Sequence, residues 1–316
     1  MFAVAKSQRF GIRSFASAAS ASIERPQSRL PTVVKPSVQE VRNSLLSERN
    51  LEHAVRAIHR DGLVVINDVM PHEVIDSLNE KMVEDALVLQ APRCTPQSPN
   101  TFTRPYLSVT SAVLGPRPKW TSCSANAAMP PLPGARPQRQ PVHSDADFAQ
   151  PTHPFALVVN VPLVSMTPEN GSTEVWLGSH TTDATAQEGA HGERVSGRIK
   201  EEPEELLDHR RRTDPSAQPV ISKGSIVVRD LRLWHAGMPN NTDKVRIMLA
   251  MIHFASWYRN PMRLEFGEDV RPILQGLQQE DKLALEIPIN CVKREKVLDT
   301  YLNRGFGNSY DFDQAP

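Results

Sequence analysis

A histidine and an aspartate stand two residues apart in the run Gln140-Pro-Val-His143-Ser-Asp145, which reads as the end of a strand. Side chains two apart on a strand share a face, so the His143 imidazole and the Asp145 carboxylate can converge on one point. Two histidines and one carboxylate around a metal, with other positions open, are typical of non-heme Fe(II) oxygenases. The pair therefore predicts a metal site that needs one more histidine.

His235 is the best candidate for that histidine, because it stands at the far end of a strand that begins at 226–228. The next strand, 245–254, carries Arg246. If the turn between these strands is centred between residues 240 and 241, His235 and Arg246 stand directly opposite each other, with Cβ atoms about 5 Å apart. We therefore expect both side chains to face the same site.

Arg246 is a charge within an otherwise apolar strand, and arginine is rarely buried without a partner. No acid occurs among residues 244–256 to pair with it. A carboxylate arriving with a ligand would satisfy the guanidinium, which can bind it through two parallel hydrogen bonds. A dicarboxylate could place one end on Arg246 and chelate the metal with the other, and 2-oxoglutarate is such a cosubstrate.

The surrounding elements are expected to be mainly strands with helices outside. Together they predict a sandwich or distorted barrel with flanking helices. We expect one domain over 36–316, with a long polar loop at 181–219 that is either a flexible cover near the site or a functionless insertion. The pattern predicts helices over 36–60 and 71–89, strands over 63–66, 155–164, 173–177, 226–228 and 245–254, and loops over 91–119 and 127–141.

The bulk composition suits a globular protein with a small-molecule substrate. The 316 residues are 39% hydrophobic and 23% charged, with a formal net charge of zero. This balance argues against a general nucleic-acid binder, which would carry a basic excess. No apolar run approaches the roughly 20 residues that span a bilayer. The three cysteines have neither zinc-site nor disulfide spacing and fit a reducing interior, while the sequence leaves the oligomeric state open.

The N-terminal segment 1–35 is expected to lie outside the fold. Lys6, Arg9 and Arg13 occur there among many Ser and Ala residues, and no acid precedes Glu24. This composition is typical of a mitochondrial transit peptide, although a disordered tail has the same features. The sequence therefore predicts either a mitochondrial protein or, if the segment is only a tail, a cytoplasmic one.

Four ordered segments resemble the phytanoyl-CoA dioxygenase family of Fe(II)/2-oxoglutarate-dependent oxygenases, and the likeness extends over about 50–258. They are His143-Ser-Asp145, Asn170-Gly-Ser-Thr-Glu-Val-Trp-Leu-Gly-Ser-His180, Trp234-His235-Ala-Gly237 and Arg246. The resemblance implies a double-stranded β-helix, that is, a jelly-roll or cupin-like barrel. It also implies Fe(II) held by His143, Asp145 and His235, with O2 as the second substrate and 2-oxoglutarate salt-bridged to Arg246.

The resemblance implies further cosubstrate contacts from Gln140, Asn160 and Thr173. It also implies oxidation of a small organic substrate, by hydroxylation or else by desaturation, epoxidation or rearrangement, and we expect a secondary metabolite. Two alternatives stay open: an acyl-CoA 2-hydroxylase of the same family, and a cupin-like metal enzyme or binding module without oxygenase activity.

Several other chemistry-bearing residues are expected to be structural. The second His-x-Asp motif, His59 to Asp61, straddles a helix end and a turn, so its two side chains need not share a face. His180 is expected to shape a turn beside the pocket, Trp176, Trp234 and Trp257 to lie in the core, and 210–212 to be a solvated run of arginines.

Overall fold

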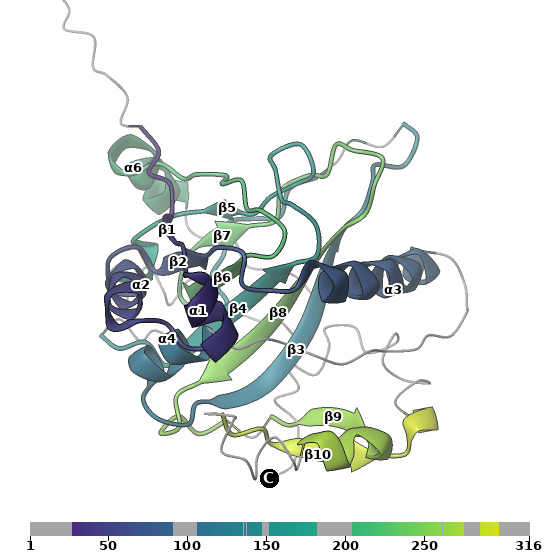
Figure 1. The fold of residues 1–316 in the computed structure, drawn as a ribbon. Helices are drawn as coiled ribbons and strands as arrows, with labels where there is room; N and C mark the ends of the chain where they lie inside the picture. Colours follow the sequence, from purple (N-terminus) through teal and green to yellow (C-terminus); the bar gives the residue numbers. More distant parts are fainter. Residues whose placement is uncertain are drawn as a thin grey trace, which may run out of the picture.

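The computed structural model describes residues 27–90, 106–134, 136, 138–146, 152–181, 204–260, 262–274 and 285–296. Its largest element is a six-stranded sheet in the order β1-β2-β6-β4-β8-β3 (Figure 1), in which β1 and β2 are parallel and the other pairs antiparallel. The strands are Thr32–Val34 (β1), Leu63–Ile66 (β2), Lys119–Ala128 (β3), Ala156–Pro162 (β4), Ile226–Asp230 (β6) and Arg246–Phe254 (β8).

Two small sheets accompany the main one. Glu174–Val175 (β5) pairs antiparallel with His235–Ala236 (β7), and Leu264–Gly267 (β9) pairs parallel with Ile289–Val292 (β10). Short 3-10 turns occur at Ser179–Thr181 (η1) and Glu268–Val270 (η3). The expected combination of a β-sheet with flanking helices is therefore confirmed, although the described helices are as extensive as the strands.

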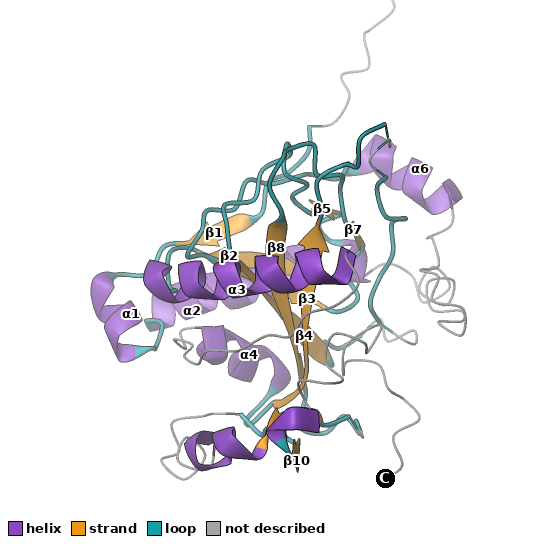
Figure 2. Ribbon diagram, turned by 90° about the vertical axis from the view of Figure 1, so that its right-hand side faces the viewer, coloured by secondary structure: helices purple, strands orange, loops and turns teal. Residues whose placement is uncertain are grey.

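The helices are Val38–Asn43 (α1), Glu48–Asp61 (α2), His72–Gln90 (α3), Tyr106–Leu114 (α4) and Glu204–Thr213 (α6). Helix α2 begins where the Ser47 side chain accepts a hydrogen bond from the Asn50 amide. It ends at Gly62, whose φ of 75° is accessible to glycine at little cost. Helices α2, α3 and α4 lie on one side of the main sheet (Figure 2), and none of the helices in the described ranges is long and apolar enough to cross a membrane.

The two faces of the main sheet differ in chemistry because strand side chains alternate. On β8, Ile247, Leu249 and Met251 belong to the core cluster beneath the helices. Arg246 and Met248, at the intervening positions, project from the opposite face and are also buried. The same alternation on β4 and β6 places Asn160 and Arg229 on the face that carries Arg246. This second face positions the candidate site.

Two predicted loops contain helices. Helix α4 occupies the end of the segment 91–119, where Leu107, Val109 and Leu114 are buried in the main core. The Pro, Ser and Thr content of the segment concealed this apolar helix, and residues 91–105 lie outside the described part.

The segment 181–219 is likewise not a loop throughout, because α6 lies within it. Residues 182–203 of this segment lie outside the described ranges. Leu207 on α6 packs with Trp176 and Trp234, and this contact with the core outweighs the polar character of the remaining helix residues. Both tryptophans are buried, as predicted, whereas the prediction is wrong for Trp257, which is 60% exposed.

The predicted register between His235 and Arg246 is wrong. His235 pairs with Val175 of β5, whereas Arg246 pairs with Ala128 of β3. The chain crosses from the small sheet to the main sheet between them, so 237–245 is not a tight hairpin. Asn240 holds this crossing, because its side-chain amide donates to the carbonyls of Ala128 and Lys244.

Candidate metal centre

Three side chains that are far apart in the sequence meet at one point. The ligand atoms of His143, Asp145 and His235 all lie within 4.8 Å of one another. Nε2 of His143 is 3.8 Å from Oδ1 of Asp145, and Nε2 of His235 is 3.6 Å from Oδ2. Donors that share an ion at about 2.1 Å each are separated by about 3–4 Å, so the two distances from imidazole to carboxylate are compatible with a cation held among the three residues.

The backbone fixes this convergence. His143 and His235 form an antiparallel bridge in which each amide donates to the other's carbonyl, at 3.0 and 2.9 Å. The Asp145 amide donates to the Leu231 carbonyl at 3.1 Å. Strand β7 also pairs with β5, so His235 is held from both edges. The predicted meeting of the three residues is therefore present, although the register used to predict it was wrong.

The hydrogen bonds of the two imidazoles set their tautomers. Nδ1 of His143 lies 2.9 Å from the Pro141 carbonyl, and Nδ1 of His235 lies 3.0 Å from the Leu233 carbonyl. A carbonyl oxygen can only accept, so each Nδ1 carries a proton, and each Nε2 faces Asp145. This arrangement, in which the other ring nitrogen is bound to a carbonyl, is the one that metal-ligating histidines adopt.

The charges nearby favour the protonation states that a divalent cation requires. Burial opposes ionisation of Asp145, but Arg229 and the two histidines outweigh it and hold the pKa of this carboxyl well below its usual range. Burial lowers the pKa of His235 well below its ordinary value, and the Arg229 charge lowers it further. A neutral imidazole and an ionised carboxylate are the metal-binding forms, and this donor set fits Fe(II).

Arg246 is buried on the sheet face that carries the site. Its Nη2 donates to the Gly171 carbonyl at 2.6 Å, and its Nε donates to the Asn170 carbonyl at 3.4 Å. Burial lowers the pKa of Arg246 to about 10, so the guanidinium is still charged at neutral pH. The carbonyls orient this charge but do not neutralise it, so the need for a carboxylate that we inferred from the sequence persists.

The three further cosubstrate contacts expected from the sequence occupy different environments, and their roles stay predictions. Asn160 is buried on β4, and its Oδ1 accepts from Nε of Arg229 at 3.3 Å. Gln140 is exposed, and its Oε1 accepts from the Gly237 amide at 2.9 Å. Thr173 is half-buried immediately before β5.

Arg229 is the site residue that the sequence analysis missed. Its Nη2 donates to Oδ2 of Asp145 at 2.5 Å, and the side chain is buried. The signal was available, because Arg229 is a charge within the apolar strand that begins Ile226-Val-Val. The following acid, Asp230, obscured it, but alternation places Asp230 on the opposite face, where it pairs with Arg232 at 2.7 Å.

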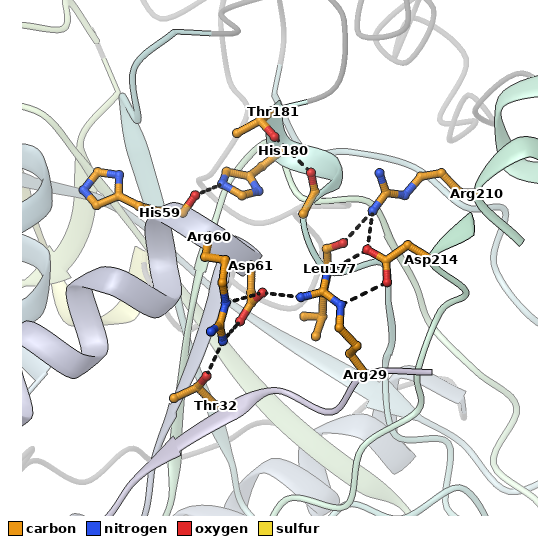
Figure 3. Close-up of polar contacts among 11 residues, drawn as sticks. Arg29, Thr32, His59, Arg60, Asp61, Leu177, His180, Thr181, Arg210 and Asp214 are labelled. Atoms are coloured by element: carbon orange, nitrogen blue, oxygen red, sulfur yellow. Dashed lines mark hydrogen bonds and ion pairs between the residues drawn. The ribbon is translucent and has the colours of Figure 1, made fainter. Parts of the chain in front are cut away.

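The second His-x-Asp motif is structural, as predicted (Figure 3). The Asp61 carboxylate accepts from Arg29 at 2.8 Å and from Arg60 at 2.5 Å, while Nε2 of His180 lies 3.2 Å from the His59 carbonyl. These contacts join α2 to the N-terminal segment and to η1. The expectation that 1–35 lies outside the fold is wrong for its last residues, because β1 pairs with β2 in the main sheet and Val34 is buried in the core.

The prediction of a solvated arginine run is wrong for Arg210. Its Nη2 donates to the Leu177 carbonyl at 2.6 Å and pairs with Asp214 at 3.3 Å (Figure 3). Arg210 therefore anchors α6 to the segment that follows β5.

Residues 94–248 match the model of the family described as phytanoyl-CoA dioxygenase (PhyH). This stretch, just under half of the chain, is similar to the PhyH family of dioxygenases. The match includes both histidines, Asp145 and Arg246, and it is shorter than the likeness over 50–258 expected from the motifs.

Solved structures with detectable similarity are distant. AviO1 from Streptomyces viridochromogenes Tue57 shares 17% identity at a TM-score of 0.49, with 66% of this chain and 96% of AviO1 covered. EctD from S. alaskensis shares 20% identity at a TM-score of 0.48, with coverage of 72% and 83%. SnoK, an alpha-ketoglutarate-dependent carbocyclase from nogalamycin biosynthesis, shares 16% identity at 0.49, with coverage of 70% and 87%. These values are low, so the family assignment depends on the family model.

Proposed function

We propose that the protein is an Fe(II)- and 2-oxoglutarate-dependent dioxygenase that oxidises a small organic substrate. The observation that carries this proposal is the convergence of two imidazoles and one carboxylate within 4.8 Å. The PhyH match and a buried, charged Arg246 on the same sheet face support it. In this proposal His143, Asp145 and His235 hold Fe(II).

The protein's own groups would bind and orient the reactants. The three ligands occupy one face of the ion and leave other positions open. Iron and 2-oxoglutarate, when bound, supply the activation of O2 and two of the electrons that reduce it. Arg246 would bind the distal carboxylate of 2-oxoglutarate through its guanidinium fork, and Asn160, Thr173 and Gln140 would help to position this cosubstrate. The apolar side chains around the site would exclude water that would otherwise compete.

The barrel expected from the family is the fold in which these parts would cooperate. We propose that the main sheet and the small β5–β7 sheet form the two sides of a double-stranded β-helix, with the metal between them. Support comes from the bridge that attaches His143 to β7 and from the hydrogen bond that attaches Asp145 to Leu231, just after β6.

The reaction would end in oxygenation, desaturation, epoxidation or rearrangement, according to how the substrate is positioned. The presence of Asp145 argues against halogenation, because a halide would need the coordination position of this carboxylate. A secondary metabolite is the substrate class we favour, since the chain has a formal net charge of zero and no recognisable site for CoA phosphates.

The test is decarboxylation of 2-oxoglutarate by the purified full-length chain. We expect succinate and CO2 to form under air with Fe(II), and not without iron, without oxygen or in the Asp145→Ala variant. If the protein with its metal converted a substrate in the absence of 2-oxoglutarate, it would be a cupin-like metal enzyme instead. Metal binding with no consumption of 2-oxoglutarate would indicate a binding module.

A further inference from the structure

Arg229 has one donor that the protein itself does not use. The side chain is buried, with Nη2 on Asp145 and Nε on Asn160. Nη1 is also buried, and it has no hydrogen-bond partner among the residues that the structure describes. Buried polar groups are nearly always hydrogen-bonded, and an exception calls for an explanation such as an absent ligand. Nη1 belongs to a group that already contacts a metal-site carboxylate.

The two arginines serve different ends of the site. Arg229 is aligned across the sheet with Val158 of β4, which is aligned in turn with Ile252 of β8. Ile252 and Arg246 are six residues apart on one strand, so the two arginine side chains start from separate positions along the sheet and reach the site from different sides. Arg229 therefore lies at the Asp145 end, whereas Arg246 lies at the end where Asn170 and Gly171 bind it.

The balance of charges around the site also indicates that Arg229 can bind a further anion. With Fe(II) and doubly charged 2-oxoglutarate bound, the charges of the metal, Asp145, the cosubstrate and Arg246 cancel. Arg229 then adds one positive charge in a buried setting, where an uncompensated charge is unfavourable. The nearby acids Asp230 and Glu174 already pair with Arg232 and Arg139, at 2.7 and 2.8 Å.

We propose that Nη1 of Arg229 binds a carboxylate of the substrate, while Nη2 of the same side chain holds Asp145 in place. The neighbouring positions on this face, Val158, Ala250 and Ile252, are apolar, so the substrate is an organic monocarboxylate with an apolar body. A thioester has no such charge, so this assignment favours a free acid over an acyl-CoA. The inference rests on the proposed function and names the substrate class for it.

The test uses full-length protein loaded with Co(II) and 2-oxoglutarate, because the visible absorption of Co(II) reports ligands near the metal without turnover. The probes are acetate, benzoate and octanoate, each compared with its own neutral amide. We expect at least one carboxylate to change the spectrum and to bind at least tenfold more tightly than its amide. Equal responses to acid and amide, or no response to any carboxylate, would overturn the proposal.

Two substitutions assign the preference to Arg229. Arg229→Met should abolish the difference between acid and amide, and Arg229→Lys should retain part of it. A preference that survives in a folded Arg229→Met protein contradicts the proposal. So does a loss confined to 2-oxoglutarate affinity, which would assign Nη1 to the cosubstrate. If Arg229→Met does not fold, Arg229→Lys decides, because an acid preference that is unchanged in this variant contradicts the proposal.

Failure of this inference is distinguishable from failure of the proposed function. If wild-type protein binds neither Co(II) nor 2-oxoglutarate, the dioxygenase proposal itself is wrong. If both bind at one equivalent per chain and no carboxylate preference is seen, only the role of Arg229 is wrong.

Discussion

The two faces of strand β8 have different roles, although they share one backbone. Toward the helices, Ile247, Leu249 and Met251 join a continuous apolar core. Toward the site, Arg246 is just as buried, and within the described ranges its guanidinium donates to two carbonyl groups and pairs with no acid. Burial of an arginine without an acid is unfavourable. The helix-covered face therefore stabilises the fold, and the site face gives up stability to present a charge.

The largest effect should come from the metal ligands, which belong to the functional side of this comparison. Asp145→Ala removes the only carboxylate of the three-ligand set, so we expect 2-oxoglutarate turnover to fall below detection while the chain stays folded. Succinate release measures the first effect and far-ultraviolet circular dichroism the second. Turnover that persists at a substantial fraction of the wild-type rate would refute the ligand assignment.

A substitution on the helix-covered face should instead lower the stability of the fold and leave metal binding unchanged. Leu249→Ala removes a buried side chain beneath the helices, and such a change costs about 2–5 kcal/mol of unfolding free energy. We expect urea denaturation to show this loss, with unchanged metal affinity in the fraction that remains folded. A variant that kept its stability but lost metal binding would show that the two faces are not separate in function.

Arg246→Met tests the charge on the site face. Hydrogen bonds to charged groups contribute about 1.5–3 kcal/mol, so KM for 2-oxoglutarate should rise by about 10- to 150-fold. Metal affinity should stay unchanged, because Arg246 contacts Asn170 and Gly171 rather than the ligands. An unaltered KM would remove Arg246 from the cosubstrate site.

His253 is the polar exception on the helix-covered face, and its effect should be the smallest at neutral pH. It is fully buried, neither ring nitrogen has a hydrogen-bond partner in the described ranges, and burial lowers its pKa to about 3. Below its ordinary pKa of 6.5 the unfolded chain takes up a proton that the folded chain refuses. Stability is therefore fully present above that value and falls as the pH drops from 6.5 toward about 3.

His253→Leu should remove this acid sensitivity. Between about pH 6.5 and pH 5 the wild type should lose on the order of 2 kcal/mol more unfolding free energy than the variant. Urea denaturation at the two pH values measures the difference. Parallel losses in both proteins would mean that His253 is protonated in the folded state.

The sequence was sufficient for the parts that depend on local pattern. The hydrophobic pattern predicted the positions of β2, β4, β5, β6 and β8 but not those of β1 and β3. The His-x-Asp spacing predicted the candidate ligands that the structure brings together. The partner of His235 could not be predicted, because the sequence does not show that β7 leaves the main sheet to pair with β5.

Contacts between residues far apart in the sequence also determine the position of α6 and the role of Arg229, which local polarity does not predict. Helix α6 is polar in sequence, yet Leu207 and Arg210 attach it to Trp176 and to the Leu177 carbonyl. Arg229 was overlooked because its importance depends on Asp145, a residue 84 positions away. Residues that act through distant partners are the ones for which composition and spacing give no direct signal.

Anaerobic titration of the full-length protein with Fe(II), followed by calorimetry, tests the central claim most directly. The account predicts one ion per chain for the wild type. It also predicts at least a 100-fold weaker affinity for His143→Ala and for His235→Ala, whereas His180→Ala, a histidine bound to the His59 carbonyl, should bind as the wild type does. Wild-type affinity in either of the first two variants would contradict it.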